Sequence, residues 1–190
     1  MRYHPDDKQK TRQRIVKVAA RRYRAEGLVS VGIANLMADL GMTHGGFYAH
    51  FTDKEALVAS ACQEAFATQL RNWDERLSRQ AAGNGLEDLI RGYLSQQHRE
   101  HPETGCFAAA LAGEIARRDN RSRQAFTAGI KQLLDRLAQS RGNSTGNIRP
   151  EAVLALMVGS MMLARAVSDP GLSDSMLSIA ADTILGNPEA

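Results

Sequence analysis

Apolar side chains recur every three to four residues along most of the chain, which is the spacing of one face of an α-helix. The pattern is longest over residues 53–79, where five apolar residues are separated by 4, 4, 3 and 4 positions: Cys62, Phe66, Leu70, Trp73 and Leu77. No segment alternates apolar and polar residues as a half-buried strand does. The sequence therefore predicts an all-α protein.

Glycine, proline and polar clusters divide this pattern into about nine helices. The expected ranges are 7–26, two short helices within 31–52, then 53–79, 84–99, 107–115, 121–139, 150–168 and 172–185. At 1.5 Å per residue, the helix over 53–79 would be roughly 40 Å long. We expect it to join a head, residues 1–52, to a body, residues 53–190.

Two short helical patterns with a tight break between them predict a helix-turn-helix. The first has four apolar residues on one face: Ile33, Leu36, Met37 and Leu40. Ser30 stands before this run as a candidate N-cap, and Gly41 follows it as a residue that can end a helix at positive φ. Thr43 is then the expected N-cap of the second helix.

The first turn of the second helix holds Gly45 and Gly46, although each glycine costs about 1 kcal/mol relative to alanine inside a helix. The absence of side chains there makes sense if another molecule, such as the wall of a DNA groove, approaches the backbone closely. Thr52 and Glu55 have the spacing of a capping box at the start of the next helix. That helix N-terminus, together with Lys54, could hold a phosphate.

The run Gly45-Gly46-Phe47-Tyr48-Ala49-His50-Phe51, followed by Lys54-Glu55-Ala56-Leu57, resembles the signature of the TetR family of bacterial transcriptional regulators. The resemblance covers about the first 60 residues. It implies that the matching positions face DNA at Ser30, Thr43, His44, Gly45, Gly46, Tyr48, His50 and Lys54. It also implies that Phe47, Phe51 and Leu57 pack inside the head.

The distribution of charge agrees with a head that binds a polyanion. The chain of 190 residues has a net charge of +3. Residues 1–55 carry 10 Lys/Arg and 6 Asp/Glu, a net +4, whereas residues 56–190 carry 14 and 15, a net −1. The basic N-terminal arm could add DNA contacts, although a solvated tail is an equal alternative.

Several other classes of protein are disfavoured by the sequence. Two cysteines in 190 residues do not form a disulfide framework, and no apolar run is long enough to span a membrane or act as a signal peptide. His44 and His50 do not share a helix face, so we predict no metal site and no cofactor. A cytoplasmic protein is the simplest interpretation. We also predict that it is not an enzyme, because Cys106 with a nearby histidine is the only candidate catalytic pair in the sequence.

The body is predicted to dimerise and to bind a ligand. The helices over 150–168 and 172–185 are apolar around much of their girth, so we expect them to form a two-fold four-helix interface; burial within the same chain is the alternative. Nine residues could converge on a mostly apolar ligand pocket. They are Trp73, Tyr93, His98, Cys106, Phe107, Phe126, Met157, Met161 and Arg165.

Cys106 follows Gly105 at the start of a predicted helix, where the helix N-terminus and His98 or His101 could stabilise a thiolate. A Gly-Cys at this place also resembles electrophile-sensing members of the family. A small packing residue is the alternative interpretation of Cys106. Together these observations predict a homodimeric, DNA-binding repressor released from an inverted-repeat operator by a small molecule or an electrophile. The sequence leaves open an effector-free DNA-binding protein, a Cys-dependent enzyme, and activation instead of repression.

Overall fold

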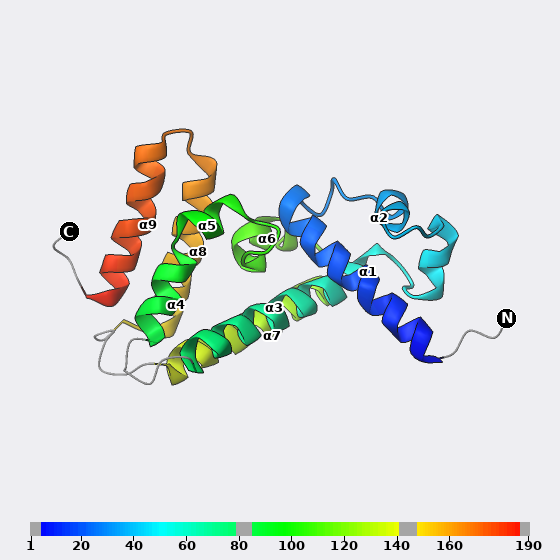
Figure 1. The fold of residues 1–190 in the computed structure, drawn as a ribbon, viewed down its shortest axis with the longest axis horizontal. Helices are drawn as coiled ribbons and strands as arrows, with labels where there is room; N and C mark the ends of the chain where they lie inside the picture. Colours follow the sequence, from blue (N-terminus) through cyan, green and yellow to red (C-terminus); the bar gives the residue numbers. More distant parts are fainter. Residues whose placement is uncertain (1–4, 79–84, 141–147, 187–190) are drawn as a thin grey trace.

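The computed structural model describes residues 5–78, 85–140 and 148–186, and within these ranges every regular element is a helix (Figure 1). The all-α prediction is confirmed. The elements in chain order are α1 Pro5–Glu26, α2 Ile33–Asp39, the 3₁₀ helix η1 His44–Ala49, α3 Lys54–Ser78, α4 Gly85–Tyr93, α5 Gln96–Glu100, α6 Phe107–Ile115, α7 Asn120–Gln139, α8 Pro150–Ala166 and α9 Pro170–Leu185.

The helices α1, α2 and η1 lie at one end of the long axis of the molecule, and α8 and α9 lie at the other (Figure 1). The helices α3 and α7 run side by side between these two ends. Gly129 of α7 permits their close approach, because a Cβ there would lie 2.1 Å from the Phe66 ring of α3. The long α3 therefore connects the two ends as one packed element, as its apolar pattern predicts.

The buried residues of the head belong to one hydrophobic core that continues into the body. The predicted inner face of α1, Ile15, Ala19 and Tyr23, is at most 1% exposed, and Leu36 and Met37 of α2 are fully buried against the same core. Phe47 and Phe51 are buried and their rings stack with centroids 5.4 Å apart. Leu57 is also fully buried. The expectation that Phe47, Phe51 and Leu57 pack inside the protein is confirmed.

Gly41 has a φ of +68° directly after α2, as predicted for a residue that ends a helix. Thr43 is the N-cap of η1, and its side chain accepts a hydrogen bond from the Gly46 N–H. Ser30, however, is not the N-cap of α2. Gly32 takes that position, because the helix begins two residues later than the serine would require.

Two other features of the helix pattern differ from prediction. Asp53, not Thr52, caps α3 by accepting a 2.7 Å hydrogen bond from the Ala56 N–H. Residues 84–99 do not form one helix, since α4 ends at Tyr93 and α5 begins at Gln96. Ser95 explains the break, because its hydroxyl donates to the Gly92 carbonyl and accepts from the His98 N–H in place of helical bonds.

Polar contacts fasten the head to the body. Glu114 of α6 accepts a 2.9 Å hydrogen bond from the Leu28 N–H, directly after α1. Arg24 of α1 donates from Nε and Nη2 to the Glu103 carbonyl, at 3.0 and 2.7 Å. Within the body, at the start of α3, Glu55 accepts from Arg118 at 2.9 Å. The orientation of the head therefore depends on α6 and on the loop that precedes it.

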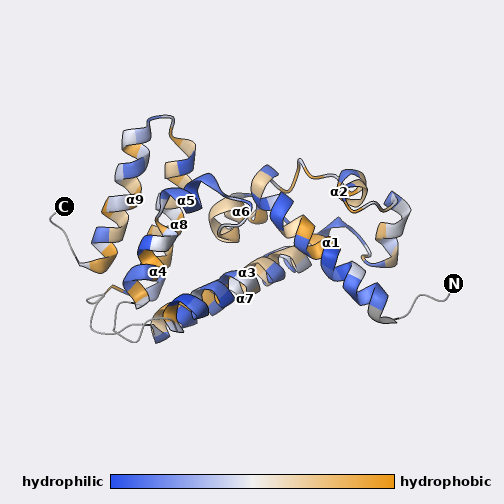
Figure 2. Cartoon of the chain, in the orientation of Figure 1, coloured by the Kyte–Doolittle hydropathy of each residue, from blue (hydrophilic) through white to orange (hydrophobic). Residues whose placement is uncertain are grey.

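The helix α6 is apolar along most of its length (Figure 2) and is buried among α1, α3, α7 and α8. By contrast, the α8–α9 pair leaves large apolar side chains in solvent. Met162, Leu163, Leu172 and Ile179 are 39%, 55%, 47% and 59% exposed. Burial within the same chain therefore accounts for only part of the apolar surface of these two helices.

Candidate DNA-reading surface and effector cavity

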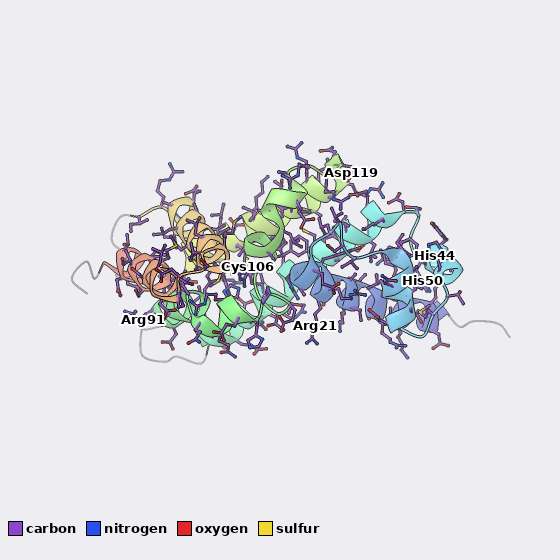
Figure 3. All side chains as sticks on the ribbon, turned by 90° about the horizontal axis from the view of Figure 1, so that it is seen from above. Arg21, His44, His50, Arg91, Cys106 and Asp119 are labelled. Carbon is purple, nitrogen blue, oxygen red and sulfur yellow. The ribbon has the colours of Figure 1, made fainter. Side chains whose placement is uncertain are left out.

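The short helix η1 presents its polar residues outward and its phenylalanine inward. Thr43, His44, Gly45 and Tyr48 are exposed, and the Tyr48 side chain is packed edge-on against His44 with ring centroids 5.8 Å apart. Gly46 and His50 are partly buried, and Ser30 is exposed in the turn before α2. His44 and His50 lie at the head end of the molecule, far from Cys106 (Figure 3). The structure thus brings most of the predicted DNA-facing residues onto one end.

Nothing inside the protein requires glycine at position 45. A Cβ placed there would have no heavy atom within 4 Å, and the φ of Gly45 is not positive. At Gly46 the nearest atom, Thr43 Oγ1, would be 3.5 Å away, which is an ordinary contact. The missing side chain at position 45 therefore serves no packing need within this chain, in agreement with a close approach from outside.

Basic residues of α1 lie beside η1, the second helix of the helix-turn-helix, and the residue that follows it closely, Phe51. The guanidinium of Arg12 lies 4.6 Å from the centre of the Phe51 ring and donates to Ser60. Burial, together with the charges of Lys8 and Arg12, holds the pKa of His50 below its ordinary value. A neutral His50 can accept as well as donate a hydrogen bond, and its Nδ1 is buried without a partner among the described residues.

Lys54 has an intramolecular partner. Its ammonium donates a 2.7 Å hydrogen bond to the Leu28 carbonyl, and burial lowers its pKa. The Leu28 peptide is therefore held on both sides, by Glu114 at its N–H and by Lys54 at its carbonyl. A phosphate contact of Lys54 stays a prediction, and would share or exchange this bond.

The body holds an open cavity of about 260 Å³ beside α3 and α4. Its floor includes the buried side chains of Trp73, Tyr93 and Cys106, and its rim includes exposed Arg76 and His101. The other lining residues are Arg24, Ala65, Thr68, Gln69, Asn72, Leu89, Gly92, Ser95, Gln97, His98, Thr104 and Gly105. Because most of these residues are polar, the prediction of a mostly apolar pocket is wrong for this cavity.

The structure divides the nine predicted ligand residues into two groups. Trp73, Tyr93, His98 and Cys106 line the cavity. Phe107, Met157 and Met161 are fully buried core residues and Phe126 packs against the core, while Arg165 lies behind the cavity and donates to the His98 and Arg99 carbonyls. The second group fails to line the cavity because apolar periodicity identifies buried faces without distinguishing a cavity wall from solid core.

His98 organises the wall around Cys106. Its Nδ1 donates to the Tyr93 carbonyl at 2.7 Å, and its Nε2 accepts from the Cys106 N–H at 2.9 Å. Burial, opposed by that Tyr93 bond and reinforced by Arg165, Arg76 and Arg24, lowers the pKa of His98 to about 4. His98 is therefore neutral at pH 7, with both nitrogens engaged. The expectation that His98 supplies positive charge to the thiol is wrong, and it cannot act as a base toward that thiol in this arrangement.

Cys106 is the N-cap residue of α6, and it lines the cavity together with Arg24. The sulfur of Cys62 is different: it is fully buried in α3, and burial raises the pKa of this thiol to about 12. Cys62 is therefore a core residue, as its place in the apolar pattern of residues 53–79 predicts, and of the two cysteines only Cys106 lines the cavity.

Arg24, Gln69 and Arg76 line the cavity although the sequence does not predict them as ligand residues. Arg24 is one of many basic residues of α1, and its place in the sequence does not indicate that its side chain points to the body. Gln69 and Arg76 look like ordinary surface positions of an amphipathic helix. Only the packing of α1 and α4 against α3 places these three side chains around one space.

Residues 15–61 match the sequence model of "Bacterial regulatory proteins, tetR family", which covers α1 from Ile15 onward, the helix-turn-helix and the first turns of α3. These residues form the DNA-binding domain of the TetR family. The chain has the fold and the DNA-binding domain of a TetR-family transcriptional regulator, as the glycine pair and the residues after it predict.

A curated relative agrees with the assignment of this domain. The chain is 24% identical over 126 residues to YerO of Bacillus subtilis (strain 168), an uncharacterized HTH-type transcriptional regulator. That match covers 66% of this chain and 43% of YerO, so the chain spans less than half of the length of that relative.

Two solved structures have the same fold. The reduced form of Escherichia coli NemR has a TM-score of 0.79 at 19% identity, covering 93% of this chain and 96% of NemR. AibR in complex with isovaleryl coenzyme A and operator DNA has a TM-score of 0.66 at 16% identity, covering 94% of this chain and 99% of AibR. No helix in the described part of the chain is both long and apolar enough to cross a membrane.

Proposed function

We propose that this chain is a ligand-responsive transcriptional repressor that binds an inverted-repeat operator as a homodimer. The observation that carries the proposal is the position of Arg24. It belongs to α1 of the head, yet its side chain lines the cavity of the body and grips the loop before α6. A ligand in the cavity can therefore act directly on the helix that supports the DNA-reading surface.

The DNA-binding part of the proposal rests on the exposed face of η1. Thr43, His44, Gly45 and Tyr48 present hydrogen-bonding groups and an open backbone, and the basic N-terminal half of α1 lies beside them. Because these exposed residues are few, one head can specify only a short DNA sequence. Two heads on an inverted repeat, roughly 34–36 Å apart or somewhat more, would give a site of useful length. We place this activity in the cytoplasm, with the DNA.

The exposed apolar residues of α8 and α9 support the homodimer. Met162, Leu163, Leu172 and Ile179 come from both helices and stand in solvent in a single chain. Packing α8 and α9 of two copies into a two-fold four-helix bundle would bury them. It would also fix the distance between the two heads, on which operator affinity depends.

The effector would work by preferring one conformation. A ligand that binds more tightly when the heads are wrongly spaced lowers operator affinity by the ratio of its affinities for the two states. AibR has been solved with both an acyl-coenzyme A and operator DNA, so the fold accommodates both kinds of partner. By analogy we propose the same two kinds of partner, DNA and a small molecule, for this chain.

Cys106 supports an electrophile as a second kind of effector. Cys106 lines the cavity together with Arg24, and it is the N-cap residue of α6. Addition of the sulfur to an electrophilic carbon would place new bulk between α6 and the cavity, next to the Arg24 contact. The alternative role of Cys106 as a small packing residue predicts no response to such reagents.

A titration of the purified protein on DNA from immediately upstream of its own gene tests the proposal. We expect saturable, salt-dependent binding with a two-fold symmetric footprint, because each neutralised phosphate contributes a log–log slope of about −0.9. Addition of metabolites or of a thiol-reactive electrophile should lower the affinity. A footprint without two-fold symmetry, or an affinity indifferent to salt, would contradict the binding mode.

A further inference from the structure

The cavity beside α3 and α4 is positively charged and contains no carboxylate among its lining residues. Arg24 and Arg76 contribute guanidinium groups, and no aspartate or glutamate lines the space. Neither arginine forms an ion pair with a carboxylate anywhere in the described ranges, in contrast to Arg22, Arg91 and Arg99. Burial lowers the pKa of Arg24, so the protein bears the cost of holding this charge partly out of water.

The floor of the cavity presents hydrogen-bonding groups that the protein does not use. The Tyr93 hydroxyl is buried, and burial keeps its pKa well above the ordinary value, so it stays a neutral donor. Apart from the interaction of this hydroxyl with the Cys106 side chain, neither it nor the buried Gln69 Oε1 has a hydrogen-bond partner among the described residues. Buried polar atoms without partners are costly, and a bound ligand can satisfy them. Trp73, 5% exposed, adds a flat apolar surface to the same wall.

We infer that the effector of this protein is a small organic carboxylate with a flat apolar body. Its carboxylate would pair with Arg24 and Arg76, its body would lie along Trp73, and the Tyr93 hydroxyl would donate to one of its oxygens. A cavity of about 260 Å³ suits a molecule of the size of a substituted benzoate. This inference rests on the proposed function and names the chemical class of its ligand.

The same geometry indicates how such an anion would act on the head. Arg24 now directs both Nε and Nη2 at the Glu103 carbonyl, an uncharged acceptor. A carboxylate accepts two parallel bonds from a guanidinium, and its negative charge adds an ionic attraction that the uncharged carbonyl lacks. A carboxylate in the cavity would therefore draw Arg24 from Glu103. That exchange removes one of the links between α1 and the body, while the Glu114–Leu28 link remains.

Ligand binding can be followed by the fluorescence of Trp73, because it is the single tryptophan of the chain and lines the cavity. Its fluorescence in the full-length protein would be titrated with benzoate, phenylacetate, cinnamate and salicylate. Each acid would be compared with its own uncharged amide, and inorganic phosphate would serve as a small anion without an apolar body. At least one acid should bind ten times or more tightly than its amide, the loss expected when one charged hydrogen bond is removed.

Substitutions of single arginines test which positive charge binds the carboxylate. Arg76→Gln, at the exposed rim, should weaken the binding of that acid about tenfold and leave the affinity of its amide unchanged. Arg123→Gln removes one positive charge from an exposed position of α7 outside the cavity, and should bind the acid normally. Arg24→Gln should also weaken acid binding, and circular dichroism would show that both cavity variants remain folded.

Three results would overturn the inference: every amide binding as tightly as its acid, phosphate binding more tightly than every acid, or Arg76→Gln binding the acid normally. Operator titrations in parallel separate this inference from the proposed function. If an uncharged compound releases the protein from DNA while no acid outbinds its amide, the repressor proposal stands and the carboxylate assignment fails. If an acid binds with the expected charge dependence but no operator binding is found, the carboxylate site stands and the repressor proposal fails.

Discussion

Replacing Gly45 should weaken DNA binding without weakening the fold. In the free protein a Cβ at this position meets no heavy atom within 4 Å, and the backbone conformation is one that other residues adopt. Gly45→Ala should therefore raise the free energy of unfolding, by about 0.4–1 kcal/mol, because the unfolded chain loses conformational freedom. Gly45→Leu should be close to neutral for stability, since its side chain extends into solvent.

The effect on DNA affinity should have the opposite sign. If the backbone at Gly45 approaches the groove wall, a leucine side chain occupies the space that DNA needs and displaces η1 outward. The loss of one or two base contacts costs about 2–4 kcal/mol, which is a decrease in affinity of roughly 30-fold or more. The single methyl group of alanine should cause a smaller loss in the same direction.

Gly113 provides a matched control. It is an exposed helical glycine of α6 whose Cβ would also have no heavy atom within 4 Å, but it lies in the body. Gly113→Ala should stabilise the protein by about 1 kcal/mol and leave operator affinity unchanged. Denaturant unfolding would measure stability, and fluorescence anisotropy with a labelled operator would measure affinity. Normal operator binding by Gly45→Leu would refute the close-approach argument.

Substitutions of residues in the body give three further predictions. Ile179→Glu together with Leu163→Glu should convert the dimer to a monomer with far weaker operator binding, measured by sedimentation, whereas a dimer that persists would place the interface elsewhere. Cys106→Ser should bind the operator but should no longer be released from it by an alkylating reagent. Cys62→Ser, a substitution in the core, should still be released. If the reagent releases Cys106→Ser to the same extent as the unmodified chain, the Cys106 thiol is not the sensor. Because the folded pKa of His98 is about 4 and its ordinary value is 6.5, the unfolded chain binds its proton more tightly. The stabilisation is therefore complete above pH 6.5 and lost as the pH falls toward 4, a change of about 3 kcal/mol that urea unfolding should detect and that His98→Asn should remove.

The sequence by itself determined the head of this protein. The apolar spacing of α1 and α2, the positive φ at Gly41 and the Thr43 cap are local properties, so a short window of residues contains the information for each of them. Phe47 and Phe51 were placed inside correctly because their spacing and the family signature agree. The caps at Ser30 and Thr52 were assigned wrongly, since several polar residues near each helix start could cap it and only the folded backbone selects one.

Only the tertiary structure decided the character of the cavity. Arg24 and Arg76 are separated by 52 positions, from residue 24 to residue 76, and nothing local marks either of them as a neighbour of Tyr93 or Cys106. The packing of α1, α3 and α4 brings them to one space and makes that space polar and positive. The role of His98 was decided in the same way, because its neutral state follows from burial and from three surrounding arginines, which together outweigh its hydrogen bond to the Tyr93 carbonyl. Periodicity indicates which face of a helix is buried, whereas the chemistry of a cavity depends on side chains from several helices that meet only when the chain folds.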